Sequence, residues 1–268
     1  RDARPGPVAA PELPPPRRGR TAVRAEFGVA ADQPLILSVG RLHPQKRHDV
    51  LIDAAARWRD LRPTPAVLIA GSGPDYLRLA ARISTSRAPV TLVGHRTDVA
   101  DLLAGADLAV VTSDWEARQL FAQEALRAGV PLVATAVGGV PELVGDAAML
   151  VPAGDVDAVD AAVRQLLADP ARRADLAARG PVQAERWPTE ADTVRAVAAL
   201  YAEVAGEAGS WPGVRRRGTG PADGGSFPGA AGPDPTARRP GRSDDRSWPD
   251  GRQAWSYGPT SGFSARRS

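Results

Sequence analysis

Short apolar runs alternate with longer amphipathic stretches along this 268-residue chain, from residue 34 onward. The apolar runs have the length of strands and are continuous rather than alternating, which is typical of strands buried on both faces of a parallel sheet. Strands are expected at residues 34–40, 66–71, 90–94, 108–113, 131–135 and 148–152. The repeated order of strand and helix predicts an α/β fold with a doubly wound parallel sheet of about six strands.

The stretches between these runs have helical periodicity. Helices are expected at residues 47–58, 74–83, 98–106, 120–129 and 155–170, with a shorter turn at 141–145. Two or three further helices follow, of which residues 188–206 form the last. In the last helix the apolar positions recur at helical spacing. These positions are Val194, Val197, Leu200, Tyr201 and Val204.

The two ends of the chain differ from the middle in composition. Residues 1–20 are rich in proline and predict a stiff, extended linker from a missing N-terminal domain. Residues 209–268 contain 12 of the 27 glycines and 8 of the 26 prolines and show no periodicity, which predicts a disordered tail. One folded domain, residues 21–208, is expected between them. A start on a linker without methionine predicts that the chain was cut from a longer protein.

Charge and cysteine content exclude several classes of protein. The net charge of +3 arises from the tail, whose 10 arginines and 5 aspartates give +5 and leave −2 for the rest. Nucleic acid is therefore not expected as a partner. The absence of cysteine excludes disulfides and cysteine-based zinc sites. No apolar run reaches the roughly 18 residues of a membrane span.

The first strand is followed by the loop "GRLHPQK", which contains two cations. Gly40 ends the strand without a Cβ that would obstruct a ligand, and Arg41 and Lys46 lie at either end of the loop. Lys46 is the only lysine among 34 basic residues. Arginine can donate to two oxygens at once and lysine supplies a compact charge, so together they suit a diphosphate.

Glycines and a histidine follow three other strands. Gly71 and Gly73 in "GSGP" resemble a phosphate-binding turn, although a tight turn is the commoner role of such a pair. His95 can line the pocket of a base or lie exposed in its loop. Gly138 and Gly139 permit positive φ and the close approach of a ligand to the backbone.

Two carboxylates follow the fourth strand. Glu116 lies in the predicted loop and Glu124 in the first turns of the next helix, so both can face one elongated ligand from different ends. Such a pair can serve in acid–base catalysis, but acceptors for sugar hydroxyls fit the spacing better. Each glutamate by itself also has a simple explanation in the helix dipole.

These loops together resemble the donor-binding half of the retaining family-4 glycosyltransferases of the GT-B fold, from about residue 20 to 206. The resemblance is carried, in order, by "VGRLHPQKRHDVLIDA", "LIAGSGP", "DLAVVTSDWEARQLFAQEALRAGVPLVATAVGGVPELV" and "AMLVPAGD". It implies that Arg41 and Lys46 neutralise the diphosphate of a nucleotide sugar. It implies further that Glu124 accepts hydrogen bonds from the ribose. Glu116 would hold hydroxyls of the transferred hexose and support the reacting centre, as a catalytic residue together with Arg41 and Lys46.

The resemblance also assigns roles to the neighbouring backbone. The amides of Gln119 and Leu120 would bind the distal phosphate or the sugar, and the loop at Gly94 and His95 would flank the base. The family works without a metal in the site or any other cofactor. The family's usual Glu-Gly-Phe-Gly is replaced here by Glu116 to Gln119, so the side chains of Arg118 or Gln119 are expected to contact the sugar instead.

We therefore expect a hexosyltransferase that uses a nucleotide diphosphate sugar and retains the anomeric configuration, of which this chain is the donor-binding half. The alternatives are a non-catalytic nucleotide-sugar-binding module and a nucleotide-sugar epimerase of the same fold. A nicotinamide-binding domain is disfavoured because no Gly-x-Gly-x-x-Gly follows the first strand. A cytoplasmic location is expected, with peripheral membrane contact through the missing domain left open. Base, sugar and acceptor are not defined by the sequence.

Overall fold

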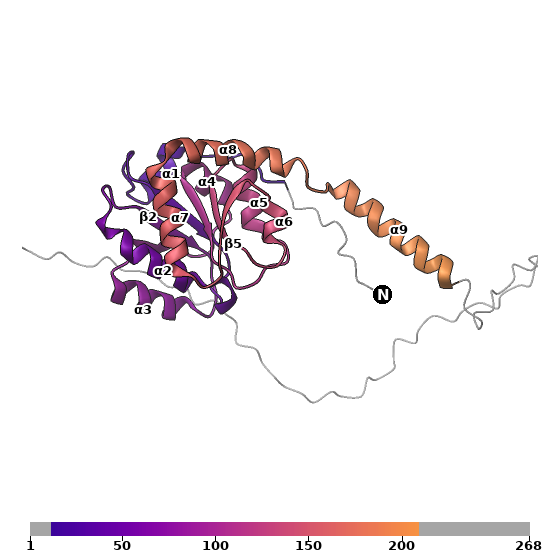
Figure 1. Cartoon of the computed structure of the whole chain (residues 1–268), viewed down its shortest axis with the longest axis horizontal. Coiled ribbons are helices and arrows are strands. Elements are labelled where there is room, and N and C mark those ends of the chain that lie inside the picture. Colours follow the sequence, from indigo (N-terminus) through magenta and orange to yellow (C-terminus); the bar gives the residue numbers. More distant parts are fainter. Residues whose placement is uncertain (1–11, 209–268) are drawn as a thin grey trace, which may run out of the picture. The chain divides into compact units, whose positions relative to one another are not determined.

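The computed structural model describes residues 12–208, with side chains as far as Val204. Six parallel strands form one sheet in the order β3-β2-β1-β4-β5-β6, which confirms the predicted doubly wound α/β fold (Figure 1). Each strand lies within the range predicted for it and is at most two residues shorter at either end. The strands are β1 (Leu35–Val39), β2 (Ala66–Ala70), β3 (Val90–Leu92), β4 (Leu108–Val111), β5 (Leu132–Thr135) and β6 (Ala148–Val151).

The helices follow the predicted periodicity, with one addition at the N-terminal side. The expected helices are α2 (His48–Arg57), α3 (Tyr76–Ser86), α4 (Val99–Gly105), α5 (Leu120–Arg127), α6 (Val140–Val144), α7 (Val156–Ala168) and α9 (Glu190–Ala208). The helices expected after α7 are two, because α8 (Pro170–Ala184) precedes α9, and two short 3-10 helices, η1 (Pro44–Lys46) and η2 (Trp58–Asp60), flank α2. Helix α1 (Arg20–Glu26) was not predicted.

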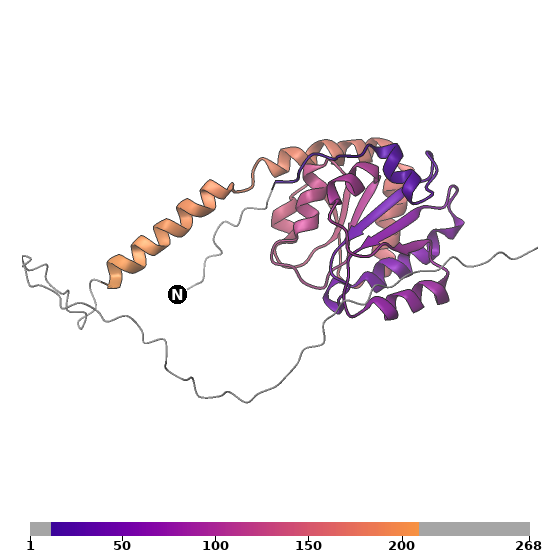
Figure 2. The ribbon, with the colours of Figure 1, turned by 180° about the vertical axis from the view of Figure 1, so that it is seen from behind.

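The sheet is buried on both faces, as its continuous apolar runs predict. In β1, Ile36 packs with Trp58 and the helices α2, α3 and α7. Its neighbours Leu35 and Leu37 point to the other face, where α1, α4, α5 and α6 cover the sheet. Figures 1 and 2 show these two helical layers from opposite sides.

Helix α1 is short and is held by a buried arginine rather than by a long apolar stripe, which is why periodicity did not reveal it. Arg24 is 3% exposed and donates to the carbonyl oxygens of Gly105 and Ala30 and to the carboxylate of Asp107. The residues just before α1 belong to the predicted linker. There the main-chain N–H groups of Arg17 and Arg18 donate to Asp101 of α4. Residues 1–11 of that linker lie outside the described part of the chain.

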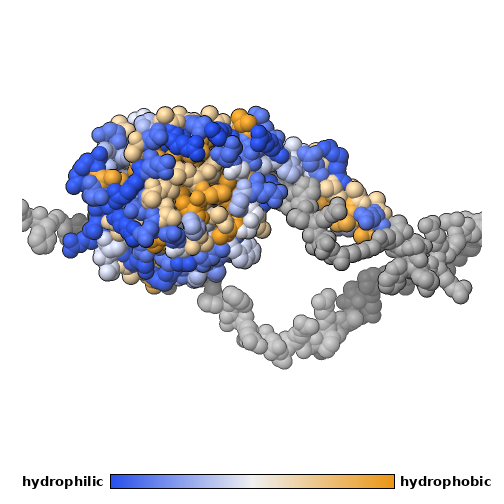
Figure 3. Space-filling model, viewed as in Figure 1, coloured by the Kyte–Doolittle hydropathy of each residue, from blue (hydrophilic) through white to orange (hydrophobic). Residues whose placement is uncertain are grey.

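Helix α9 forms as predicted, but its apolar positions are not buried. Their exposed fractions range from 46% at Val197 to 73% at Tyr201, and Figure 3 shows apolar surface on this helix. No helix in the described residues is long and apolar enough to cross a membrane. The predicted disordered tail, residues 209–268, lies outside the described residues.

The strand order places a topological switch between β1 and β4. The chain builds outward from β1 through β2 to β3 and then returns to place β4 on the other side of β1. At such a switch the loops after the two central strands diverge and leave a crevice at the carboxyl edge of the sheet. Here those loops are residues 40–47 and residues 112–119.

Candidate functional site

The two loops at the switch point bring the only lysine to one of the predicted carboxylates. Lys46 Nζ lies 2.5 Å from Glu116 Oε1, although 70 residues separate the two in the sequence. The Lys46 side chain is 13% exposed and that of Glu116 is 7% exposed. The same carboxylate oxygen accepts from Ser113 Oγ at 2.7 Å and from Gln119 Nε2 at 3.2 Å. A buried carboxylate with three donors, one of them cationic, is a well-defined anchor for the crevice.

Hydrogen bonds between the loops hold this pair in place. Thr112 Oγ1 donates to the main-chain oxygens of Lys46 and Arg47, at 3.1 and 2.9 Å. Gln45 Nε2 donates to the main-chain oxygen of Trp115 at 2.7 Å. On the lysine side, Pro44 begins the 3-10 helix η1, and Arg47 takes a left-handed conformation with φ 47° before α2 begins. Lys46 is thus fixed by its backbone as well as by its charge partner.

Arg41 differs from Lys46 in having no partner in the described part of the chain. It lies exposed just after Gly40, and its guanidinium makes no hydrogen bond or ion pair with any residue between 12 and 208. The place that a Cβ on Gly40 would take is 3.6 Å from Lys46 Cδ and 3.7 Å from His48 Nε2, so Gly40 packs directly against the lysine stem and the histidine ring. Arg41 is therefore a cation at the crevice that is available to a ligand.

Glu124 lies on α5, partly buried, and its carboxylate accepts no hydrogen bond from the described residues. Burial raises the pKa of the Glu124 carboxyl above its ordinary value, against the opposing effect of Arg127. A half-buried carboxylate without donors lacks part of its solvation, so a ligand with hydroxyl groups would supply what the protein does not.

The start of α5 offers main-chain donors. Gln119 caps the helix, because its side-chain oxygen accepts from the N–H of Phe121 at 3.3 Å. The N–H groups of Gln119 and Leu120 themselves make no hydrogen bond with the described residues. The Nε and Nη2 atoms of Arg118 are buried and also have no partner there. These free donors make the helix start suited to an anion or to sugar oxygens.

The predicted glycines share one local role, which is to let neighbouring loops touch. A Cβ on Gly71 would lie 1.9 Å from the main-chain oxygen of Gly40, and one on Gly73 would lie 2.3 Å from that of Leu42. Their φ angles of +154° and +155° also favour glycine. These residues hold the Arg41 loop against the loop after β2, and direct contact with substrate remains a prediction for both.

The glycine pair after β5 does the same for the Glu116 loop. A Cβ on Gly138 would lie 2.0 Å from the main-chain oxygen of Glu116, and one on Gly139 would lie 2.2 Å from that of Ala117. The N–H of Gly139 donates to the Glu116 oxygen at 3.0 Å. His95, predicted beside the base, is exposed in the loop after β3.

Sequence reasoning missed His48, which lies behind the cationic loop. The ring is 3% exposed, and burial lowers its pKa to about 4, so it is neutral at pH 7. Backbone atoms of Arg41 and Gly40 lie near the ring, but neither ring nitrogen makes a hydrogen bond of normal geometry with the described residues. Its place two residues after Lys46, at the start of a helix, was the available signal.

The side chains at the switch point pack closely on one another. The space enclosed by Ser38, Lys46, His48, Thr112 and Gln119 is smaller than a water molecule, so a ligand would lie over these side chains and not between them. Among residues 12–208, no three or more histidine, aspartate or glutamate side chains are grouped so as to hold a metal ion.

We expect the Glu124→Gln variant to be more stable than the parent protein at pH 7, because the charged carboxyl is poorly solvated. A raised folded-state pKa gives stability that is fully present below the ordinary value of 4.5 and is lost as pH rises through the raised pKa. The advantage of the variant should therefore shrink as the pH is lowered from 7 to 4.5. Urea denaturation at several pH values measures the difference in free energy of unfolding between variant and parent, with Glu185→Gln as an exposed control. An advantage of equal size at every pH would contradict the burial of a charge at this position.

A doubly wound sheet with cations, carboxylates and a helix start at its switch point defines the class of α/β domains that bind nucleotides at this edge. The chain belongs to the family described as Glycosyl transferases group 1, whose model matches residues 19–183.

Individual relatives are also named as glycosyltransferases. The chain is 36% identical over 193 residues to the D-inositol 3-phosphate glycosyltransferase of Kineococcus radiotolerans, covering 63% of this chain and 44% of that protein. It is 40% identical over 132 residues to the enzyme of that name from Mycolicibacterium smegmatis, covering 47% and 30%. The chain thus spans less than half the length of these curated relatives.

Solved structures show the same relationship. The sucrose-phosphate synthase of Thermosynechococcus elongatus superposes with a TM-score of 0.61 at 27% identity, over 70% of this chain and 50% of that chain. HepE of Anabaena, solved in complex with UDP and glucose, superposes with a TM-score of 0.60 at 26% identity, over 69% and 51%. The resemblance noted in the sequence is confirmed at the level of the glycosyltransferase family.

Proposed function

We propose that this chain is the donor-binding half of a hexosyltransferase that uses a nucleotide diphosphate sugar and retains the anomeric configuration. The observation that supports this most directly is the Lys46–Glu116 pair at the switch point. Arg41 and Glu124, on the same two loop–helix units, have no hydrogen-bond partner among the described residues. Two cations and two carboxylates along one crevice match the alternating chemistry of a nucleotide sugar, which has an anionic diphosphate between two hydroxyl-bearing rings.

In this proposal the cations hold the diphosphate and stabilise it as the leaving group. Arg41 is free to donate two hydrogen bonds, while Lys46 exchanges part of its contact with Glu116 for a phosphate oxygen. Charge then builds on a phosphate that already faces fixed positive groups. Removing one such preorganised donor typically costs about 3–4 kcal/mol of barrier. No metal ion or other cofactor is part of the proposal.

The carboxylates and the start of α5 hold the two rings. Glu124 accepts from the ribose hydroxyls, which satisfies its unpartnered carboxylate, and Glu116 accepts from hydroxyls of the hexose. The free N–H groups of Gln119 and Leu120 bind the distal phosphate or the sugar. The partnerless nitrogens of Arg118 take the place of the backbone approach that the two glycines provide in the usual family motif.

UDP sugars are the first donors to test, because HepE of Anabaena was solved with UDP and with UDP-glucose. We place the acceptor-binding site in the part of the relatives' length that this chain does not span. The names of the relatives favour a transferase over a binding module or an epimerase. Residues 21–208 are proposed as the donor domain, and contact with a membrane is left to the unspanned part.

Calorimetric titration of the full chain with UDP-glucose and GDP-mannose tests the proposal. We expect saturable binding that is selective for one base and at least about tenfold weaker in Glu124→Ala, because ribose loses a charged acceptor. Glu185→Ala, which removes an exposed carboxylate from the end of α8, should bind like the parent chain. Unchanged affinity in Glu124→Ala would overturn the assigned role. Transfer with retained configuration is then tested on the chain supplied with the N-terminal half of a relative.

A further inference from the structure

The three donors that hold Glu116 all meet at one of its two carboxylate oxygens. Lys46 Nζ, Ser113 Oγ and Gln119 Nε2 donate to Oε1. The other oxygen, Oε2, accepts from no group of the described residues, although it is not fully buried and can be reached from outside. A carboxylate with one oxygen held and the other free is oriented by the protein and still able to accept hydrogen bonds from a ligand.

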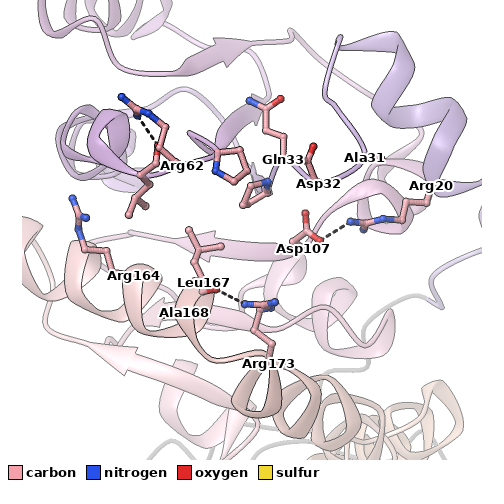
Figure 4. Close-up of a pocket in the computed structure, with 13 residues that line it drawn as sticks. Arg20, Ala31, Asp32, Gln33, Arg62, Asp107, Arg164, Leu167, Ala168 and Arg173 are labelled. Carbon is pink, nitrogen blue, oxygen red and sulfur yellow. Dashed lines mark hydrogen bonds and ion pairs between the residues drawn. The ribbon is translucent and has the colours of Figure 1, made fainter.

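A carboxylate at the opposite edge of the sheet shows the contrasting arrangement, with both oxygens in use. Asp107 lies beside a cavity where the strands begin, and Figure 4 shows its contact with Arg20. Asp107 Oδ1 accepts from Arg20 at 2.6 Å, while Oδ2 accepts from Arg24 at 3.1 Å and from the N–H of Leu35 at 2.7 Å. These contacts only tie α1 to the beginnings of β1 and β4. The free oxygen of Glu116 therefore sets it apart from a carboxylate that supports the fold.

Gln119 connects the orientation of Glu116 to the start of α5. It is buried, and while Nε2 donates to Glu116 at 3.2 Å, Oε1 accepts from the N–H of Phe121 at 3.3 Å. The reverse orientation of this amide would place its oxygen against the carboxylate and its nitrogen against an N–H group, so only one orientation is compatible with both neighbours. The side chain is thus held at both ends.

This contact gains importance once a nucleotide sugar is bound. In the proposed function Lys46 exchanges part of its contact with Glu116 for a phosphate oxygen, which partly withdraws the only charged donor. Ser113 keeps a hydroxyl that rotates freely about a single bond. Gln119 cannot turn in the same way, because Phe121 fixes the other end of its amide.

We propose that Gln119 is a positioning residue for recognition of the hexose. It holds Oε1 of Glu116 so that Oε2 accepts from a hydroxyl of the transferred sugar, and it thereby sets the affinity for the sugar part of the donor. The inference rests on the proposed function. Gln119 stands where the usual family motif has its second glycine, which has no side chain to hold the carboxylate. A nucleoside diphosphate without the sugar makes no contact with Oε2, so its binding does not depend on Gln119.

The Gln119→Ser variant separates this role from helix capping. Serine is a favoured N-cap residue, so an acceptor remains at the start of α5, but its side chain is too short to reach Glu116. Calorimetric titration of the full chain is expected to show about tenfold weaker binding of UDP-glucose and unchanged binding of UDP. If the chain selects the other base, GDP-mannose and GDP are compared instead. Gln119→Thr, which also keeps a cap, serves if the serine variant does not fold.

Gln123→Leu is the matched control, because Gln123 is also buried and lies one turn further along α5. Its Nε2 donates to the main-chain oxygen of Gln119 at 3.4 Å, and its Oε1 has no partner in the described part of the chain. This variant is expected to bind UDP-glucose and UDP like the parent chain.

Three results would overturn the role of Gln119. They are full affinity of Gln119→Ser for UDP-glucose, equal weakening of UDP-glucose and UDP in that variant, and the same selective loss in Gln123→Leu. Failure of the parent chain to bind either nucleotide sugar would instead overturn the proposed function, and the role of Gln119 with it.

Discussion

The Lys46→Ala variant is expected to lose donor binding and to lower the free energy of unfolding by about 3 kcal/mol, because it leaves a buried carboxylate without its cation. The side chain of Glu116 is 7% exposed and would keep only the neutral donors Ser113 and Gln119. In the proposed function the same change removes one of two charges from the diphosphate. Urea denaturation and calorimetric titration with UDP-glucose measure the two effects separately.

A second variant separates structure from function at this pair. In Lys46→Met combined with Glu116→Gln no charge is left unpaired, so stability should return most of the way to that of the parent protein. Donor binding should stay lost, because neither the cation nor the carboxylate is present. If the double variant bound UDP-glucose with parental affinity, the pair would be structural only.

The Lys46→Arg variant addresses why lysine is kept at this one position. The ammonium lies in a space bounded by Ser38, His48, Thr112 and Gln119 that is smaller than a water molecule. A planar guanidinium is larger and needs more donors satisfied, so we expect weaker donor binding even though the charge is kept. Parental affinity in Lys46→Arg would show that charge alone matters here.

The Gly138→Ala variant is expected to destabilise the protein by about 3 kcal/mol or more, and to weaken donor binding by displacing Glu116. The added Cβ would lie 2.0 Å from the main-chain oxygen of Glu116, and backbone cannot yield as the end of a flexible side chain can. The hydrogen bond from the N–H of Gly139 to the same oxygen would be lost with the displacement.

Gly28→Ala is the matched control, because it has the same backbone strain without the collision. Gly28 has φ +65° against +50° for Gly138, and nothing lies within 4 Å of the place of its Cβ. A left-handed alanine alone costs about 1–2 kcal/mol. Urea denaturation measures the free energy of unfolding of both variants. An equal decrease in the two would show that the close contact with Glu116 does not contribute to the destabilisation.

These glycines show a limit of sequence reasoning about the site. In a sequence, a glycine that lets a ligand approach the backbone looks the same as one that lets a neighbouring loop approach. In both cases the sequence shows only that a Cβ is absent. Gly71, Gly73, Gly138 and Gly139 were predicted beside a substrate, and that contact stays a prediction. The coordinates add that each lies beside another loop's main-chain oxygen, which the sequence did not indicate.

Helix α9 shows a related limit. The spacing of Val194, Val197, Leu200, Tyr201 and Val204 correctly predicted a helix, because periodicity reports which residues share a face. It does not report what covers that face, and these residues are exposed in the described part of the chain. Helix α1 was missed for the opposite reason, since Arg24 supplies by hydrogen bonds what an apolar stripe usually supplies.

The sequence by itself determined the order of strands and helices, the burial of the strands on both faces and the loops that carry cations and carboxylates. Each of these follows from local composition and from periods of two to four residues. Strand order, by contrast, depends on contacts between residues that are far apart in the sequence. The return of β4 to the side of β1, and not to that of β3, was decided by how the apolar faces pack in three dimensions. That choice alone brings Lys46 to Glu116 across 70 residues of chain and makes one site of two separate loops.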